Sequence, residues 1–442
     1  MLLIYTPYTT NRIKYIMQYV FEERLGVEYS IINNKEEFAG NVSAIKIVYA
    51  TNDSVTGAFF YAHELLFEND VKEIELNEGV HNNIPVLFFH NNPNAVLNFD
   101  VFAAVFYLLS RYEEYLNEAL DKHGNYNYKN SILFKLKILD TPVVEQWIEL
   151  LKKTLLKNFP GLQFKPHKAK FGLSFDIDVA YAYTNRNAVR MIGGLSKKIL
   201  QLNFSEAKNQ LLTLLNKKED MFDTYDYISI SLKTKKPVFF FNMGLYGKFD
   251  KNPSFRNKKF RQLIQQISKK AVVGLHPSYA SNRNKNLIAI EKNKLEQIID
   301  RPVTASRQHY LKLKFPVTYN NLLSNDFTTD FTMGYSADYG FRAGTCNSFL
   351  FFDLFKDEST KLRLYPFAYM DVSLNTYLKL DVEDAKKIVS KLIDITYKYN
   401  GVFIPLWHNS TLCNCKEWKG WREVFEHTLR EIDNKNFENL FD

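Results

Sequence analysis

The stretch Phe171-Gly-Leu-Ser-Phe-Asp-Ile-Asp178 constrains the fold more than any other part of the sequence. It is an apolar run that ends in two acidic residues, which is typical of a buried parallel strand. Side chains two positions apart on a strand share a face, so Asp176 and Asp178 can point into one site. Two carboxylates there suit a metal ligand beside a general base. Taken alone, the stretch fits an ordinary strand-to-turn junction equally well, because Asp is common in turns.

Strand patterns alternate with helix patterns from about residue 168 to the end of the sequence. This alternation predicts a parallel sheet or a (β/α) barrel, with the chemistry at the C-terminal ends of the strands. Residues 179–235 form a Lys-rich, helical insertion, which we expect to make one wall of a cleft. The predicted strands are 171–175, 238–242, 271–275, 303–306 and 402–407, and the predicted helices are 197–215, 258–267, 287–299, 319–324 and 382–399.

Residues 1–165 are expected to form a separate, small α/β domain of unknown role. Pro160-Gly161 and Pro166 mark the boundary, and residues 166–442 make up the second domain. The first domain contains no chemical motif, and we interpret Arg111, Glu113 and Glu114 as a salt-bridged, exposed helix face. Its predicted strands are 2–5, 44–50 and 84–89, its predicted helices are 11–25, 100–120 and 143–159, and 59–67 fits either.

The composition is that of a soluble globular protein, with 46% hydrophobic and 24% charged residues among 442. The formal net charge of +8 comes from lysines spread along the chain. Because there is no basic arm or nucleic-acid motif, we expect no nucleic-acid partner. No apolar run approaches the roughly 18 residues of a membrane span, and the first residues fit a strand better than a signal peptide. The expected location is therefore the cytoplasm, while the oligomeric state is not indicated.

Three cysteines, Cys346, Cys413 and Cys415, provide no disulfide framework, which fits a reducing compartment. Cys413-Asn-Cys415 lacks the second Cys pair of a soft-metal site, so we interpret both as incidental thiols. Aromatic residues reach 15%. They suit a packed core, and they also suit clefts that face sugars.

Histidines follow three of the predicted strands at the point where each strand ends. His276 follows one strand, His309 follows the next beside Arg307, and His408 follows the last. A single histidine in such a place is more often structural. Three of nine histidines at strand ends, together with the Asp pair, favour a site. His and Asp side chains suit zinc or another divalent transition metal.

These residues lie in motifs that resemble those of the NodB-homology polysaccharide deacetylases, carbohydrate esterase family four. Within that family the chain is similar to a two-domain bacterial subgroup that is largely uncharacterised. The resemblance covers about residues 168–412, and the order of the motifs is more specific than any one of them. The matching segments are Ser174-Phe-Asp-Ile-Asp178, Pro237-Val-Phe-Phe-Phe-Asn-Met-Gly244, Gly274-Leu-His276, Ser306-Arg-Gln-His-Tyr310, Pro366-Phe-Ala-Tyr-Met-Asp371 and Leu406-Trp-His408.

The resemblance implies a distorted (β/α) barrel and a role for each motif residue. Asp178 and His276 would bind a divalent metal, with zinc favoured. Asp176 would be the general base, oriented by Arg307. His408 would protonate the leaving amine. Such a set suits amide hydrolysis, which needs a polarised carbonyl, an activated water and a proton for the departing nitrogen.

The sequence departs from the family pattern at one metal ligand. The family usually has a second His four positions after the first, and Ala280 stands there. His309, where the family usually has Pro, is the candidate to replace it. Equally, the metal is lost or weakly held.

Substrate contacts are predicted at four residues. The segment 330–345 is dense in Gly, Tyr and Asp, which is typical of an active-site loop. Its Arg342 suits a substrate carboxylate or phosphate, or it caps carbonyls of a structured surface loop. Tyr310, Asp371 and Trp407, which lie in the matched motifs, are the other three.

The sequence therefore predicts an α/β enzyme that removes an acyl group, N-acetyl above others, from a carbohydrate or glycan precursor. One alternative is a catalytically silent relative that binds glycan or a protein partner, which Ala280 favours. Another is hydrolysis of a different C–N bond by the same type of site.

Overall fold

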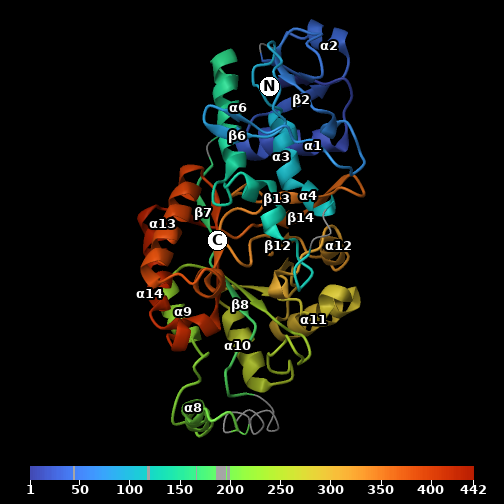
Figure 1. Cartoon of the computed structure of the whole chain (residues 1–442). Helices are drawn as coiled ribbons and strands as arrows, with labels where there is room; N and C mark the ends of the chain where they lie inside the picture. The colour runs from blue at the N-terminus through green and yellow to red at the C-terminus, as the bar shows by residue number, and fades with distance from the viewer. Residues whose placement is uncertain (43–44, 117–119, 166, 186–195, 197–199) are drawn as a thin grey trace. The chain divides into compact units, whose positions relative to one another are not determined.

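The computed structural model describes residues 1–442 except 43–44, 117–119, 166, 186–195 and 197–199 (Figure 1). The fold is mixed α/β, and the chain divides into two compact units. Unit 1 contains Met1–Lys168, Lys314–Tyr319 and Phe341–Pro366. Unit 2 contains Ala169–Leu313, Asn320–Gly340 and Phe367–Asp442. The first segment of unit 1 ends near residue 165, but two later segments that we assigned to the second domain also belong to unit 1.

Unit 1 is built on a four-stranded parallel sheet in the order β2-β1-β3-β4. Alternating side chains of these strands form an apolar cluster that includes Leu3, Val48 and Phe59. Gly26, with φ of 61°, ends the first helical segment, as expected for a C-cap glycine. The elements are β1 Leu2–Tyr5, α1 Asn11–Met17 with its π-helical continuation Gln18–Leu25, β2 Tyr29–Ile32, α2 Lys35–Gly40, β3 Lys46–Ala50, β4 Ala58–Tyr61, β5 Gly79–His81, β6 Ile84–Val86, α5 Ile132–Lys135 and α6 Val143–Asn158.

The long helix predicted over 100–120 is two helices, α3 Val101–Leu109 and α4 Tyr112–Leu116. The break lies at Arg111, which has φ of 54°, a left-handed conformation that no helix continues through. The guanidinium of Arg111 is buried and pairs with the carboxylates of Glu113 and Glu114, each at 2.9 Å. The prediction of an exposed salt-bridged face was therefore wrong, since these charges lie inside unit 1.

The segment 341–366 contributes an antiparallel pair, β13 Phe349–Asp353 and β14 Glu358–Leu364. Phe352 of β13 packs against the rings of Tyr15 and Phe106 in unit 1. The sequence pattern alone did not separate this pair from the second region, because an apolar strand does not reveal which core it joins.

Unit 2 contains seven parallel strands in the order β12-β11-β10-β9-β8-β17-β15. In the described part of the chain no pairing joins β15 to β12, so hydrogen bonding does not show the closed barrel that we expected. The strands are β8 Ser174–Ile177, β9 Val238–Phe241, β10 Val272–Leu275, β11 Ala305–Ser306, β12 Thr329–Asp330, β15 Tyr369–Met370 and β17 Pro405–His408.

Helices flank these strands, and a small second sheet lies in the same unit. α13 and α14 lie side by side in Figure 1. The second sheet has the order β16-β7-β18. The remaining elements of unit 2 are β7 Lys170–Phe171, α8 Phe204–Leu214, α9 Tyr225–Leu232, α10 Lys258–Ser268, α11 Lys285–Ile299, α13 Val382–Lys398, β16 Val402–Phe403, α14 Trp421–Asn434 and β18 Glu438–Asn439, and α12 spans Val317–Leu323. Part of the predicted helix 197–215 falls outside the described residues.

Cys413 and Cys415 form a disulfide, whereas we expected incidental thiols. Their Cα atoms are 5.3 Å apart, within the range that a disulfide spans. Cys346 is a buried free thiol. Among the helices that the structure describes, none is both long and apolar enough to cross a membrane.

Candidate functional site

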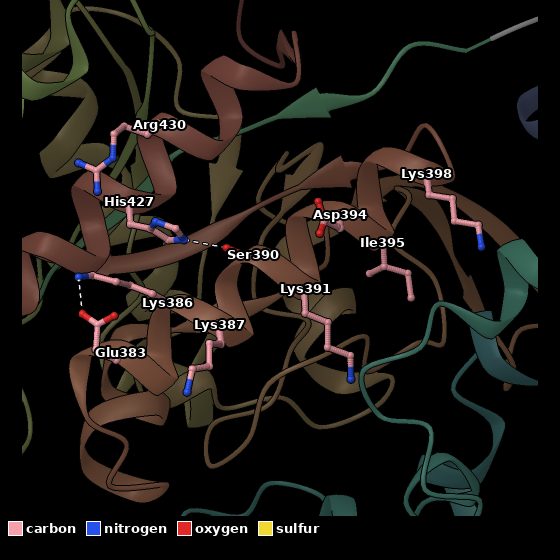
Figure 2. Close-up of a pocket in the computed structure, with 10 residues that line it drawn as sticks. All are labelled: Glu383, Lys386, Lys387, Ser390, Lys391, Asp394, Ile395, Lys398, His427 and Arg430. Carbon is pink, nitrogen blue, oxygen red and sulfur yellow. Dashed lines mark hydrogen bonds and ion pairs between the residues drawn. The ribbon is translucent and has the colours of Figure 1, made fainter.

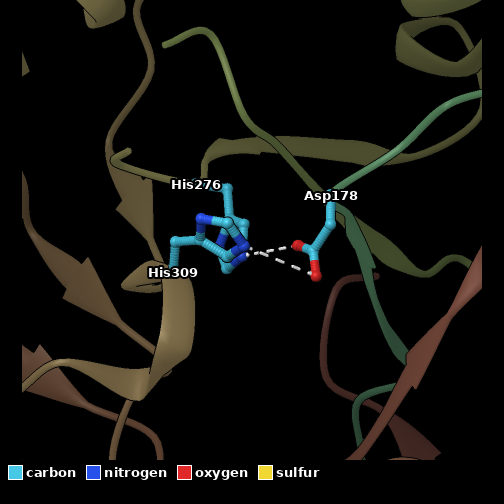
Figure 3. Close-up of side chains that lie close together, drawn as sticks. All are labelled: Asp178, His276 and His309. Atoms are coloured by element: carbon cyan, nitrogen blue, oxygen red, sulfur yellow. Dashed lines mark ion pairs between the residues drawn. The ribbon is translucent and has the colours of Figure 1, made fainter. Parts of the chain in front are cut away.

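The polar residues predicted at strand ends meet at the C-terminal ends of β8, β10, β11 and β17 in unit 2. One ligand atom from each of Asp178, His276 and His309 lies within 4.8 Å of the others. Figure 3 shows both imidazole rings facing the Asp178 carboxylate. Parallel strands bring these three residues together although the chain separates Asp178 from His309 by more than 100 positions.

Asp178 follows β8 in a turn that neighbouring polar side chains hold. The amide of Asn252 donates to the Ile177 carbonyl and accepts from the Ala180 N–H at 2.7 Å. These bonds fix the backbone on both sides of Asp178. Its side chain is 31% exposed, so it faces solvent on one side and the two histidines on the other. The turn thus presents a carboxylate at the end of a buried strand.

The two histidines present the same nitrogen to Asp178. His276 contacts the Arg307 carbonyl through Nδ1 at 2.5 Å, and its Nε2 is 2.9 Å from Asp178 Oδ1. His309 contacts Asp250 through Nδ1 at 2.9 Å, and its Nε2 is 3.6 Å from Asp178 Oδ2. An imidazole that donates from Nδ1 offers its Nε2 lone pair when the ring is neutral. Both rings are therefore oriented as metal ligands would be.

The distances in this group fit a divalent transition metal. Two atoms that each lie about 2.1 Å from a tetrahedral ion are about 3.4 Å from each other. The separations of 2.9 and 3.6 Å between the two Nε2 atoms and the Asp178 oxygens bracket that value. Two imidazole nitrogens and one carboxylate form a ligand set known for catalytic zinc, with one position left for water. His309 thus completes a group of three side chains that could hold such an ion.

The charges within the group stabilise one another. Burial alone would lower the pKa of His309, but the Asp178 and Asp250 carboxylates outweigh it and raise the pKa to about 9. Burial would raise the pKa of Asp178, but the adjacent histidines hold it well below its usual range. In the absence of a cation, protonated histidine supplies the positive charge that Asp178 requires.

Asp176 lies deeper in the sheet and is held by Arg307. Both side chains are buried, and Arg307 Nη1 donates to Asp176 Oδ1 at 2.9 Å. Arg307 also donates to the Phe331 carbonyl and to the Ser174 hydroxyl, and its guanidinium lies 4.7 Å from the ring centre of Phe240. The other carboxylate oxygen of Asp176 is 3.8 Å from His276 Nε2. One oxygen is thus anchored and the other faces the metal-ligand group.

His408 forms a second charged pair, with Asp371. His408 Nδ1 is 2.8 Å from Asp371 Oδ1, and the His408 backbone N–H donates to Asp371 Oδ2 at 2.7 Å. Burial would lower the pKa of His408, but Asp371 outweighs it, with help from Asp178 and Asp176, and raises the pKa to about 10. His408 Nε2 lies 3.6 Å from Asp178 Oδ2. This arrangement keeps a protonated imidazole beside the candidate metal position.

Three of the four predicted substrate contacts are buried side chains. Trp407 is fully buried and packs against Phe425, because alternation along β17 turns it away from the face that carries His408. Asp371 is fully buried and bound to His408, so it is positioned to act through that ring. Arg342 lies in unit 1, where it is buried and pairs with Glu114 at 2.6 Å.

Tyr310 is the predicted contact that remains accessible, with 39% exposure. It follows His309 directly, and φ of 60° turns its side chain out of the local helical path. Its ring packs against Phe249 and Tyr279 at centroid distances of 5.3 and 5.4 Å. A group of aromatic rings beside the histidines is the kind of surface on which a sugar ring stacks.

Sequence reasoning missed Asp250, Asn242 and Asn252, which bind the site residues. Asp250 and Asn252 lie in the irregular segment between β9 and α10, where no periodic pattern marks a residue as buried. Asn242 lies within the motif Pro237–Gly244 that we quoted, and its amide donates to Asp250. Only that motif offered a signal.

A separate pocket of about 850 Å³ lies on α13 and α14, away from these residues (Figure 2). Its cations are partly neutralised, since Lys386 pairs with Glu383 at 2.8 Å. Ser390 and His427 hydrogen-bond across the two helices at 2.7 Å. No predicted site residue lines this pocket: its lining comprises Glu383, Lys386, Lys387, Ser390, Lys391, Asp394, Ile395, Lys398, His427 and Arg430. We interpret it as a surface groove between packed helices.

Comparison with known families places one match in the N-terminal region. A family of unknown function, DUF7033, matches residues 2–160. No curated protein matches the chain.

Several solved structures are similar to part of the chain. A polysaccharide deacetylase from Mycobacterium smegmatis is 10% identical and aligns over 61% of this chain and 85% of its own, with a TM-score of 0.38. A polysaccharide deacetylase from Bacillus cereus is 14% identical over 61% and 90%, with a TM-score of 0.30. A Xyl-CE4 domain of a multidomain xylanase from the hindgut metagenome of Trinervitermes trinervoides is 9% identical over 62% and 87%, with a TM-score of 0.29. Similarities of this size carry no information about activity.

Proposed function

We propose that this protein is a metal-dependent hydrolase that removes an acyl group, N-acetyl above others, from a carbohydrate. One observation carries the proposal. Asp178, His276 and His309 form a metal-ligand set, and two further charged pairs, Asp176 with Arg307 and Asp371 with His408, face the same place. The order of the motifs along the sequence supports it, and so does the row of parallel strands whose C-terminal ends carry these residues.

The ligand set is assigned to Asp178, His276 and His309, and zinc is the metal that this set favours. Zinc, when bound, supplies Lewis acidity toward a carbonyl oxygen and lowers the pKa of water. The side chains of the protein would supply the general base, the general acid and the contacts that position the ligands. The two Nδ1 contacts hold the rings so that both Nε2 atoms point at one position.

Asp176 is assigned as the general base. Its carboxylate accepts the proton of the attacking water, and Arg307 holds one oxygen so that the other faces the reacting atoms. Attack of the water oxygen on the acyl carbon is followed by cleavage of the C–N bond. His408, which the Asp371 carboxylate keeps protonated, donates its proton to the departing nitrogen.

A carbohydrate substrate is supported by the accessible aromatic rings beside the histidines. Tyr310 projects next to His309, and Phe249 and Tyr279 pack against it. Stacking on such rings binds a sugar while the acyl group reaches the polar site.

The test is acetate release from N-acetylated and O-acetylated oligosaccharides by zinc-loaded protein. We expect release that stops when a chelator removes the metal and returns when zinc is restored. The matched control is Asp176→Asn, which should bind zinc and release no acetate above background. Glycan binding without acetate release from any substrate, in protein with bound zinc, would instead support the silent relative.

A further inference from the structure

We infer that Asp250 is the positioning residue that makes His309 a metal ligand, an inference that rests on the proposed metal site. Asp250 lies between β9 and α10, is buried, and has its carboxylate against the Nδ1 of His309 at 2.9 Å. No motif contains it. Its position is the one from which a carboxylate directs the opposite ring nitrogen toward a metal.

The carboxylate of Asp250 is held in place by groups other than His309. The Asn242 amide donates to its Oδ1 at 2.8 Å, and the Tyr279 backbone N–H donates to the same oxygen at 3.1 Å. Asn242 directly follows β9 and Tyr279 lies in the segment after β10, so two strand ends fix this oxygen. The Gly247 N–H also donates to the Asp250 carbonyl at 2.9 Å. Asp250 is therefore a rigid reference point for the ring.

The contact determines which nitrogen of His309 faces the site. Asp250 accepts, so Nδ1 carries a hydrogen, and Nε2, on the side of Asp178, is the nitrogen whose lone pair a metal would take once the ring is neutral. The Asn242 amide also lies 3.3 Å from His309 Nδ1. The Asp250 contact is shorter and involves a carboxylate, and the amide already donates to the same carboxylate. The Asp250 carboxylate therefore determines the orientation of the His309 ring.

His309 depends on this support more than His276 does. His309 lies in a short helical turn in which Tyr310 and Leu311 have φ of 60° and 51°, so no regular strand or helix orients its ring. His276 follows β10 directly and contacts a backbone carbonyl. A carboxylate partner makes an imidazole more basic than a carbonyl does, which strengthens its bond to a metal. The chain that lacks histidine at 280 thus carries both a substitute ligand and the residue that orients it.

The experiment measures the zinc dissociation constant with a competing chromophoric chelator, in wild-type protein, Asp250→Asn, His309→Ala and the double variant. We expect Asp250→Asn to weaken zinc binding about 10–100-fold, as loss of such a partner usually does. Once His309 is alanine, the Asp250 change should add less than about threefold, because its effect passes through that ring. Cobalt substitution gives a second reading: the visible spectrum of Asp250→Asn should approach that of His309→Ala.

Glu291→Gln is the matched control. Glu291 is a buried carboxylate that accepts from the Ser278 N–H rather than bonding to a histidine, so it supports the segment after β10 that contains Tyr279. Its zinc affinity should stay within about twofold of wild type. Asp250→Glu, which keeps the charge and displaces the oxygen, replaces Asp250→Asn if that variant does not fold.

Zinc binding by wild type and Asp250→Asn with equal affinity would overturn the inference while leaving the proposed function intact. Additive losses from Asp250→Asn and His309→Ala would overturn it as well. If wild type binds no zinc, the proposed function fails first, and the inference fails with it.

Discussion

Arg307 and Asp176 form a buried ion pair at 2.9 Å between the ends of two parallel strands. Each residue of the pair makes further contacts, and these differ between the two. Arg307 ties the carboxylate to the Phe331 carbonyl and the Ser174 hydroxyl. The other oxygen of Asp176 faces His276. The packing of these strand ends and the proposed role of Asp176 as a base thus depend on the same ion pair.

Replacing Arg307 with alanine should destabilise the protein strongly. The substitution leaves the Asp176 carboxylate buried without its guanidinium, and breaking a buried pair in this way costs about 3–5 kcal/mol. Arg307→Lys should recover part of the loss, because an ammonium cannot make all three contacts at once. Urea denaturation of metal-free protein measures both. Equal stability of wild type and Arg307→Ala would contradict a structural contribution from the pair.

Asp176→Asn should separate chemistry from binding. Asparagine has the same shape and cannot accept the proton of the water, so hydrolysis should fall about 10²–10⁴-fold. Zinc content, measured by atomic absorption, should stay at one per chain. Near-normal turnover in this variant would assign the base elsewhere.

Zinc affinity should rise with pH up to about 9. The pKa of His309 is raised to about 9 in the metal-free protein, because two carboxylates outweigh its burial. Zinc must displace the proton that the ring carries below that pH, so apparent affinity should fall by about tenfold per pH unit below 9 and level off above it. Calorimetry in buffers of different ionisation enthalpy counts the released proton. Affinity that does not change between pH 7 and 9 would place His309 outside the ligand set.

Arg342→Ala should affect stability and leave the site alone. Arg342 pairs with the buried Glu114 in unit 1, and Glu114 keeps Arg111 as a second partner, so the loss of Arg342 should lower the unfolding free energy by less than the about 3–5 kcal/mol that an unpaired buried charge costs. The zinc dissociation constant should be unchanged. A variant of wild-type stability that fails only in substrate binding would restore the original prediction of a substrate contact.

Much of unit 2 was predictable because its strands are short, continuous apolar runs. Val238–Phe241 and Val272–Leu275 each stand out from polar surroundings, and His276 follows the second. Thr329–Asp330 and Tyr369–Met370 were not predictable as strands, since two residues make no pattern. Backbone pairing with the neighbouring strands β11 and β17 defines these two strands.

The residues of the candidate site could be predicted where the order of motifs along the sequence identified them. They could not be predicted where their position depends on tertiary packing. Asp178, His276 and His309 come together as the pattern indicated. Trp407 was predicted to meet substrate because it lies in a matched motif, but the structure buries its side chain, and its strand neighbour His408 faces the opposite way. Asp250 lies 59 positions before His309 in an irregular segment, so only the folded chain brings it to the ring.

The three proposed ligands come from the ends of β8, β10 and β11, and this has a consequence for how the chain would acquire a metal ion. No short stretch of the unfolded polypeptide contains two of them, since the nearest two, His276 and His309, are 33 positions apart. Zinc therefore finds no complete set of ligands until the parallel sheet has formed. Added zinc should slow unfolding and raise the melting temperature without accelerating refolding. The ion would then stabilise the native state and leave the folding transition state unchanged.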